Sequence, residues 1–525
     1  MASTPWGDKK AAPGKATHAV STASGTHTYT DEEKFAFADW INDALRKDGD
    51  LKHLLPLNPN DDSLFKSVYD GILMCKLIND AVPGTVDERA INKTKLNAFR
   101  IGENQTLVLN SSRSIGCNVI NISSVDLMEG TNHLVLGLMW QIIKIGLLSK
   151  INLKSHPELY RLLEPGETIE DLLKLPADQL LLRWVNYHLK EAGSSRRIRN
   201  FGGDISDSEA YTILLKQIAP KNSGVDTTAM SESDPTKRAA KMLDQADKID
   251  CKKFVRPADV VNGNTKLNLA FVANLFNHYP ALEPVEEVVE EIIEETREEK
   301  TYRNWMNSLG VDPFVNHLYE DLRDGIVLLQ LLDKIQPGIV DWKKVNQPPF
   351  KAMGGNMKKI ENCNYAITLA ASLKFSLVGI EGKDIYDGSK THTLAVVWQA
   401  MRAYTLAILT RLSGTGKPIS DNEIISWANS VVPAQFQISG WKDEKIRDSR
   451  PVAHIVDHIR AGTIDHANLV INGSQDDNVA NAKYTISSAR KIGAVVYTLP
   501  EDVAEGNAKM ILTLFAALMA ASLQK

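Results

Sequence analysis

The feature that most constrains this chain is a pair of sequence markers that occurs four times in the same order. The first marker is Trp-x-Asn, and its copies are Trp40/Asn42, Trp184/Asn186, Trp305/Asn307 and Trp427/Asn429. The second is Asp, three residues, Gly and a helix-capping residue, and its copies are Asp126…Gly130-Thr131, Asp259…Gly263-Asn264, Asp384…Gly388-Ser389 and Asp502…Gly506-Asn507. Two independent markers repeating in one order indicate one module used four times. Such a chain is more typical of a protein that binds repeatedly than of an enzyme.

Length and charge narrow the class of protein. The 525 residues are too many for one hydrophobic core and fit roughly three to five domains. An apolar fraction of 43% is ordinary for globular protein, so each repeat can bury a core. The net charge of -5 argues against a nucleic-acid-binding protein, which needs a basic surface. We therefore expect no nucleic-acid partner.

Cysteine usage and hydropathy favour a cytoplasmic protein. The cysteines lie far apart and form no C-x-x-C pair: Cys75, Cys117, Cys251 and Cys363. This pattern is typical of a reducing compartment, and of neither a disulfide framework nor a zinc ribbon. Residues 1–30 contain no apolar run of the signal-peptide kind, and the apolar stretch 510–523 is too short to cross a bilayer. We expect no metal and no membrane partner.

The residues around each Trp predict an amphipathic helix. The positions three before and one after the Trp are apolar in every copy, as in Phe37, Trp40 and Ile41. This spacing places the side chains on one helical face. The residue after each marker Gly, such as Thr131, is a good helix N-cap. Clear strand alternation is missing and the repeats exceed the usual solenoid period, so we predict an all-α chain of compact bundles.

The four repeats are of two kinds. Repeats 1 and 3, here A-type, share Asp70-Gly71 and Asp324-Gly325, each followed by a Pro-Gly pair, and a Trp in the closing helix, Trp140 and Trp398. Repeats 2 and 4, here B-type, lack these features and have the same spacing between their two markers. The order A-B-A-B indicates a duplicated pair.

The markers and the composition between them divide the chain. The predicted segments are a flexible stretch at 1–29, domains at 30–150, 175–282, 298–412 and 417–525, and an acidic linker at 283–297. The linker alternates Val and Ile pairs with glutamates, which is consistent with a solvated helix and with a semi-rigid spacer. Both interpretations stay open.

Motifs for catalysis or cofactor binding are weak. We interpret the marker tryptophans as core anchors and the Asp-Gly elements as caps and turns. Gly414-Thr415-Gly416-Lys417 resembles a phosphate loop, but Arg411 stands where the first Gly is needed and Pro418 replaces Ser or Thr. No H-E-x-x-H zinc helix occurs. We expect no catalysis and no cofactor.

The A-type repeats carry a longer pattern, Glu-x-x-Ala/Thr-aromatic-x-x-Trp-x-Asn. It begins at Glu33 and at Glu298 and ends at Asn42 and Asn307. With these motifs the chain resembles the calponin-homology family, and its A-B-A-B order is most similar to the fimbrin (plastin) branch. No EF-hand loop is found in the sequence, so we expect filament binding to be independent of calcium.

This resemblance implies a fold and a function. The fold would be four calponin-homology helical bundles arranged as two tandem actin-binding domains. The function would be crosslinking and bundling of F-actin by a monomer that bridges two filaments in the actin cytoskeleton. A calponin-homology scaffold or microtubule-associated adaptor is the alternative, and the A-B tandem argues against it.

The resemblance also implies an actin surface on the first and last helices of each A-type repeat and on the linker that follows. The candidate residues are Glu33, Asn42, Gln141, Lys144, Ile145, Leu147, Leu148, Lys150 and Lys154 in the first half, and Glu298, Asn307, Met401, Arg402, Tyr404 and Arg411 in the second. Their cations would steer the encounter with acidic actin. The apolar residues among them either contact the filament or pack in the core, because half of an amphipathic helix faces inward.

Overall fold

One short hairpin precedes a chain of helices. The computed structural model describes residues 17–22, 25–285 and 295–525. Strand β1 (Thr17–Thr22) pairs antiparallel with β2 (Gly25–Thr30), and every other regular element described is helical. This hairpin lies inside the segment predicted as flexible and was not predicted, although its frequent β-branched threonines favour extended backbone. The rest of that segment, 1–16 and 23–24, and linker residues 286–294 lie outside the described residues.

Each repeat is a small helical bundle. Repeat 1 contains α1 (Asp31–Ala44), α2 (Ser63–Lys66), α3 (Ile72–Ala81), α4 (Ala98–Ser114), α5 (Ser124–Glu129) and α6 (Asn132–Leu148). Repeat 2 follows α7 (Ile169–Leu173) and contains α8 (Ala177–Glu191), α9 (Glu209–Ile218), α10 (Pro235–Asp247), α11 (Pro257–Val261) and α12 (Thr265–His278). Repeat 3 contains α13 (Arg297–Ser308), α14 (Leu318–Asp321), α15 (Ile326–Ile335), α16 (Gly355–Ser372), α17 (Gly382–Tyr386) and α18 (Lys390–Ser413). Repeat 4 contains α19 (Asp421–Val431), α20 (Arg450–Ile459), α21 (Gln475–Lys491), α22 (Pro500–Glu505) and α23 (Ala508–Leu523). No helix in the described part of the chain is long and apolar enough to cross a membrane.

The Asn of the first marker fastens a loop to the first helix of its repeat. Asn42 accepts a hydrogen bond from the Leu57 amide and donates one to the Leu57 carbonyl. The same two-bond clamp joins Asn186 to Ile198, Asn307 to Val315 and Asn429 to Ile438. An amide side chain can satisfy one backbone donor and one acceptor at once, so it closes the loop without leaving an unpaired polar group. The first marker is therefore a structural element in all four repeats.

The second marker begins the closing helix of each repeat. Its Asp carboxylate accepts a hydrogen bond from the backbone amide three residues earlier, at Ser123, Arg256, Glu381 and Leu499. Its Gly adopts a left-handed conformation, with φ of 65°, 62°, 73° and 79° in chain order. The next residue occupies the N-cap position of α6, α12, α18 or α23. The side chains of Asn264 and Asn507 accept a capping hydrogen bond as predicted, whereas those of Thr131 and Ser389 do not. The marker is a turn that sets the direction of the last helix.

The marker tryptophans are core residues to different extents. Trp184 and Trp305 are fully buried, whereas Trp40 and Trp427 are half-buried and pack at the edge of their cores. The prediction of a core anchor therefore holds fully for two copies and in part for the other two. Helical periodicity identifies the inward stripe of a helix, but it does not say how deep the stripe lies.

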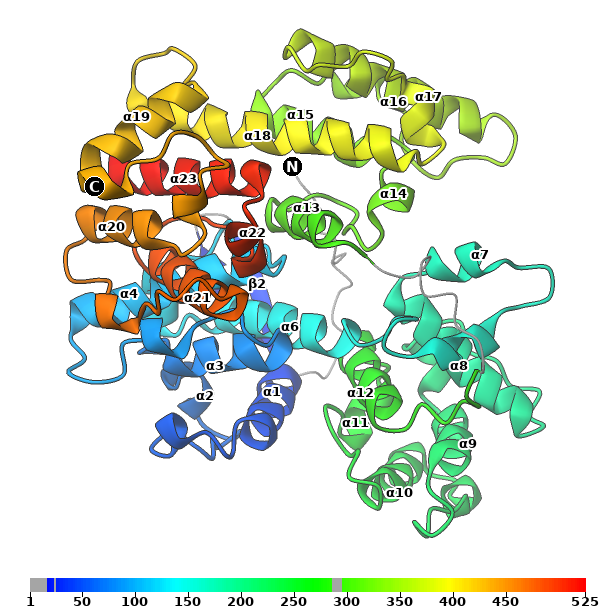
Figure 1. Ribbon diagram of the computed structural model, residues 1–525. Coiled ribbons are helices and arrows are strands. Elements are labelled where there is room, and N and C mark those ends of the chain that lie inside the picture. The colour runs from blue at the N-terminus through cyan, green and yellow to red at the C-terminus, as the bar shows by residue number, and fades with distance from the viewer. Residues whose placement is uncertain (1–16, 23–24, 286–294) are drawn as a thin grey trace.

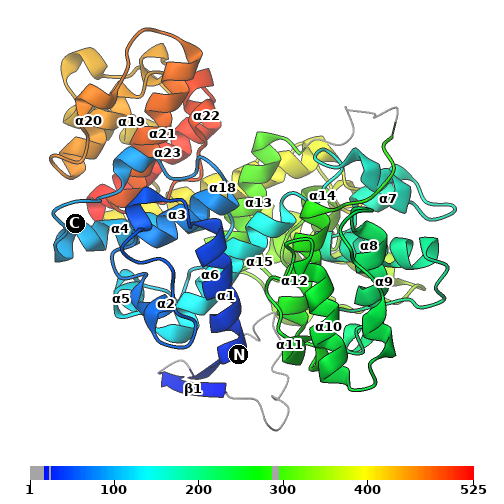
Figure 2. The same cartoon turned by 90° about the horizontal axis from the view of Figure 1, so that it is seen from below.

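The two halves of the chain pack against each other. Figures 1 and 2 show repeat 4 lying against repeat 1, with α21 beside α4. Helix α13 of repeat 3 also contacts α4, and repeat 2 lies on the other side of repeat 1. Within each half, the closing helices of the two repeats pair: α6 with α12, and α18 with α23. Helix α4 is thus covered by both repeats of the second half.

We expect Trp184→Ala to lower the free energy of unfolding of its repeat by about 3–5 kcal/mol, because it removes a fully buried aromatic side chain. Trp427→Ala should cost less, because that side chain is half-buried. Denaturant unfolding followed by far-UV circular dichroism measures both, with Trp342→Ala at an exposed position as the control. An equal loss for Trp184→Ala and Trp427→Ala would contradict this ranking of burial.

Candidate functional site

The A-type and B-type repeats of the first half meet at an ion pair placed over an aromatic ring. The Lys266 ammonium donates to the Glu33 carboxylate at 2.7 Å and lies 5.7 Å from the centre of the Trp140 ring. Between the same two repeats, the rings of Trp40 and Phe254 stack with their centres 4.7 Å apart. Both charged side chains are mostly shielded from solvent, with 16% of Glu33 and 30% of Lys266 exposed, so water screens the pair less than at an open surface. We call Glu33, Lys266 and Trp140 the joint of the first half.

The second half builds the same joint at the corresponding positions. The Lys509 ammonium donates to Glu298 at 3.3 Å and lies 5.6 Å from the centre of the Trp398 ring. Glu298 also accepts a hydrogen bond from the hydroxyl of Tyr302 at 2.7 Å. In both halves the Glu comes from the first helix of the A-type repeat, the Trp from its last helix and the Lys from the last helix of the B-type repeat. Glu33 and Glu298, expected at the actin surface, lie between two repeats.

In the last helix of repeat 1, Leu147 is buried and the other candidate residues are half-buried. Gln141 forms a two-bond clamp with the backbone of Asn118, at 2.8 and 3.0 Å. Burial lowers the pKa of Lys144, which faces Asp178 and Lys266. Leu147 is a core residue, and Ile145 and Leu148 are half-buried against the same core. Leu147 therefore packs in the core, whereas Ile145 and Leu148 contact the core and keep part of their surface exposed.

The corresponding residues of repeat 3 are also engaged inside the protein. Met401 is buried, and Tyr404 packs edge-on against Trp305 with ring centres 5.9 Å apart. Arg402 pairs with Asp421 of repeat 4 at 2.6 Å. Arg411, close to the end of α18, is exposed.

The candidates that reach the surface are therefore few. Asn42 and Asn307 act as loop clamps. Lys150 and Lys154, just after α6, and Arg411 are the exposed cations of the expected set. Two positions that sequence reasoning did not select, Lys266 and Lys509, contribute to the joint. Their equal spacing from the marker Gly in both B-type repeats was the available signal.

Comparison with known proteins identifies the repeats. A family model described as the calponin homology (CH) domain matches residues 31–147, 175–281, 296–406 and 418–524. The chain is 61% identical over 508 residues to fimbrin of Dictyostelium discoideum, an alignment that covers 96% of this chain and 83% of that protein. The chain belongs to the fimbrin (plastin) family of calponin-homology proteins. The resemblance inferred from the motifs is confirmed, and the repeats are CH1 to CH4.

Other relatives agree with this assignment. The chain is 52% identical over 523 residues to plastin-1 of Homo sapiens, covering 97% of this chain and 83% of that protein. A crystal structure described as the actin-crosslinking core of Schizosaccharomyces pombe fimbrin is similar in fold, with a TM-score of 0.79 and 40% identity. That match covers 94% of this chain and all of the other.

Buried cations of CH4 hold it against CH1. Arg490 is 4% exposed and donates to the carbonyls of Val496 and Thr85, the second of which is in CH1. Lys491 donates to the CH1 carbonyl of Ala90 at 3.0 Å. Burial lowers the pKa of both side chains, to about 10 for Arg490. Backbone carbonyl oxygens accept the hydrogen bonds of these two buried cations. The contact between CH4 and CH1 therefore depends on the conformation of the CH1 loop that contains the acceptor carbonyls.

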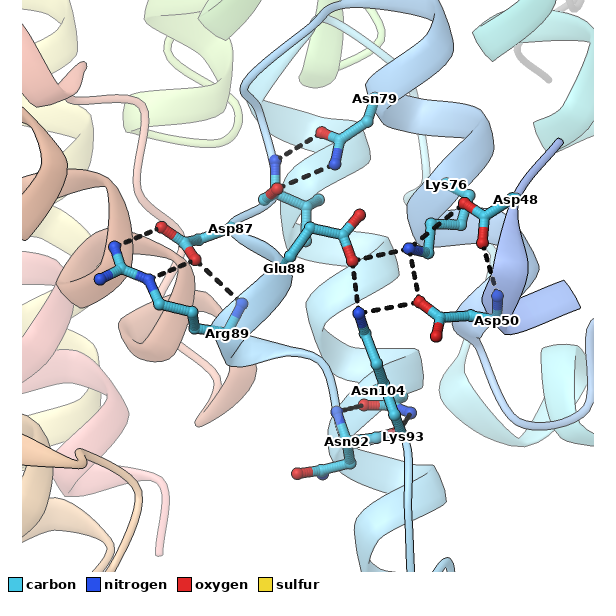
Figure 3. Close-up of polar contacts among 11 residues, drawn as sticks. Asp48, Asp50, Lys76, Asn79, Asp87, Glu88, Arg89, Asn92, Lys93 and Asn104 are labelled. Carbon is cyan, nitrogen blue, oxygen red and sulfur yellow. Dashed lines mark hydrogen bonds and ion pairs between the residues drawn. The ribbon is translucent and has the colours of Figure 1, made fainter. Parts of the chain in front are cut away.

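That loop is fixed from both sides, as Figure 3 shows. It contains the short helix η2 (Glu88–Ala90), in which Glu88 accepts hydrogen bonds from Lys76 and Lys93, both at 2.6 Å. On the opposite side Arg89 pairs with Asp87 and donates to the CH4 carbonyls of Asn468 and Ala480. The Lys76 and Lys93 ammonium groups also hold the pKa of Asp50 at about 2. The CH1 core thus positions the face on which CH4 docks.

Lys266→Glu should loosen the contact between CH1 and CH2, because it places a carboxylate against Glu33 and removes the cation over Trp140. We expect faster backbone hydrogen exchange in α1 and α12, corresponding to a loss of about 1.5–3 kcal/mol, the range for a hydrogen bond to a charged group. The control is Lys190→Glu, an exposed CH2 lysine. The double variant Glu33→Lys/Lys266→Glu should recover part of the loss. Unchanged exchange in Lys266→Glu would show that the joint does not hold the two repeats.

Proposed function

We propose that this chain crosslinks and bundles actin filaments, with each tandem pair binding one filament. The observation that carries the proposal is the joint, which recurs in CH1–CH2 and CH3–CH4 with the same three residue types on the same three helices. A joint built twice makes two binding units of the same geometry in one chain. The relatives support the partner, since one is described as an actin-crosslinking core. The chain would act as a monomer in the cytoplasm, on the actin cytoskeleton, without cofactor or catalysis.

The filament contact is proposed on the surface that the joints leave open. It comprises the outward face of α1, the residues that follow α6 and the end of α18, with Lys150, Lys154 and Arg411 as the exposed cations. The joint holds the first and last helices of each A-type repeat in one orientation, which presents these residues as a single surface. Cations at its edge would raise the association rate with acidic actin and fix the register.

Reversing the two exposed charges of the first half should weaken filament binding. We expect Lys150→Glu/Lys154→Glu to raise the dissociation constant roughly tenfold, by like-charge repulsion, with unchanged helicity. Added salt should weaken binding by the parent more than by the variant, since exposed charges are screened over about 8–10 Å. High-speed co-sedimentation measures both, and Lys190→Glu/Lys237→Glu, two exposed CH2 lysines, is the matched control. Equal binding by variant and control would exclude this patch.

Each tandem pair alone should bind filaments without bundling them. Residues 1–282 and 298–525 each retain one joint, so each should pellet with filaments at high speed. The intact chain should also pellet bundles at low speed, because a bound half holds the other at a raised concentration near a second filament. Circular dichroism of each fragment controls for folding. Bundling by a single fragment as strong as by the intact chain would contradict the two-site proposal.

A further inference from the structure

CH3 carries an exposed segment that combines lysines with large apolar side chains. The segment runs from the short helix η7 (Trp342–Lys344) through the following loop into the start of α16. Three apolar side chains are open to solvent: Met353 is 94% exposed, Met357 62% and Trp342 38%. Five lysines accompany them: Lys343, Lys344, Lys351, Lys358 and Lys359. We call this the CH3 basic face.

In CH1 the equivalent surface is covered by CH4. The equivalence follows from hydrogen bonds, because Asn92 is fastened to Asn104 in CH1 as Asn346 is fastened to Asn362 in CH3. In CH1, η2 precedes this Asn pair. The carbonyl of Ala90 in η2 accepts from Lys491 of CH4, and the carbonyl of Thr85, just before η2, accepts from Arg490. In CH3, η7 precedes the pair, and Figure 1 shows α16 at the edge of the molecule. The CH3 basic face thus corresponds to a docking face that no described part of this chain covers.

The CH3 loop also differs from its CH1 counterpart in length and chemistry. The two asparagines are 16 residues apart in CH3 and 12 in CH1. The longer loop contains Lys351 and the protruding Met353. At η7, Trp342 and Lys343 stand in place of Glu88 and Arg89 of η2. Both changes add apolar surface or remove negative charge.

Three of the five lysines of the CH3 basic face have no ion-pair partner among the described residues. Lys343, Lys351 and Lys358 form no ion pair with any described residue, and Lys359 lies 5.4 Å from the centre of the Phe350 ring. Asp341 is 3.9 Å from Lys344. Asp324 attracts Lys359, and the nearby carboxylates of Asp333 and Glu361 are held by local hydrogen bonds, Asp333 to the amides of Gly338 and Val340 and Glu361 to Asn346. None of them is paired with Lys343, Lys351 or Lys358. In a chain with a net charge of -5, this face therefore selects an anionic partner.

We propose that the CH3 basic face binds the anionic surface of a lipid bilayer. A protruding methionine between lysines suits that surface, because the apolar part enters the acyl boundary while the ammonium groups stay among the headgroups. Each lysine near an anionic bilayer adds attraction that salt weakens. The sequence predicted no membrane partner because it lacks a spanning segment, and a surface contact requires none. This binding is independent of the two filament surfaces, so it would attach bundles to membranes.

Vesicle co-sedimentation of the intact chain tests this proposal. Phosphatidylcholine vesicles containing about 30% phosphatidylserine should pellet the chain, and pure phosphatidylcholine should not. Lys343→Glu/Lys351→Glu/Lys358→Glu should weaken binding about tenfold or more, and added salt should weaken binding of the parent. Met353→Ser/Met357→Ser keeps every charge and should weaken it severalfold. The matched control, Lys190→Glu/Lys221→Glu/Lys237→Glu, makes the same charge change on CH2 and should bind vesicles like the parent.

Two results would overturn the proposal. One is equal vesicle binding by the CH3 triple variant and its CH2 control, which would show that net charge alone matters. The other is no binding of the parent to phosphatidylserine vesicles. If filament binding is also lost in the CH3 variant, the face would be assigned to an acidic protein instead. Actin co-sedimentation without vesicles separates these outcomes from failure of the crosslinking function, since the CH3 variant should bind filaments normally.

Discussion

The interaction on which the two-unit architecture depends is a lysine of the B-type repeat bound between a glutamate and a tryptophan of the A-type repeat. The ammonium-to-carboxylate distance is 2.7 Å between Lys266 and Glu33 and 3.3 Å between Lys509 and Glu298. In both pairs the ammonium lies over an indole ring. The ring excludes water from one side of the cation, which strengthens its attraction to the carboxylate. Because the three side chains come from three helices, the joint fixes the first and last helices of each A-type repeat against the B-type repeat.

The sequence carried enough information to predict the fold class, the four repeats and their A-B-A-B order. Asn42 and its three counterparts recur because each repeat needs a loop clamp, and Gly130 and its counterparts recur because a turn there needs a left-handed residue. Such requirements come from local backbone geometry, so they appear in a single sequence as the same residue type at the same position of each repeat. The hairpin at 17–30 escaped prediction because its strands are short and carry little alternation of apolar and polar residues.

The candidate site was harder to predict for a physical reason. Periodicity locates a helical stripe, but the chain uses both faces of α1 and α6, one for the repeat core and one for the neighbouring repeat. Glu33, Gln141 and Lys144 are polar residues that the neighbouring segments cover, so polarity did not mark them as surface. Arg490 and Lys491 at the end of α21 likewise resemble ordinary solvent-exposed helix ends, although CH1 buries them. Contacts between repeats depend on partners far away in the chain, which spacing within one repeat cannot reveal.

The central claim is that one chain, with two copies of the same joint, bridges two filaments. Counting molecules at filament contacts tests it most directly. Sparse chains with one fluorophore each would be imaged where two actin filaments of different colours run side by side, and their photobleaching steps counted. The account predicts that most labelled particles found at such contacts bleach in a single step. Consistent two-step bleaching would contradict the account, because it would mean that two chains must associate before filaments are joined.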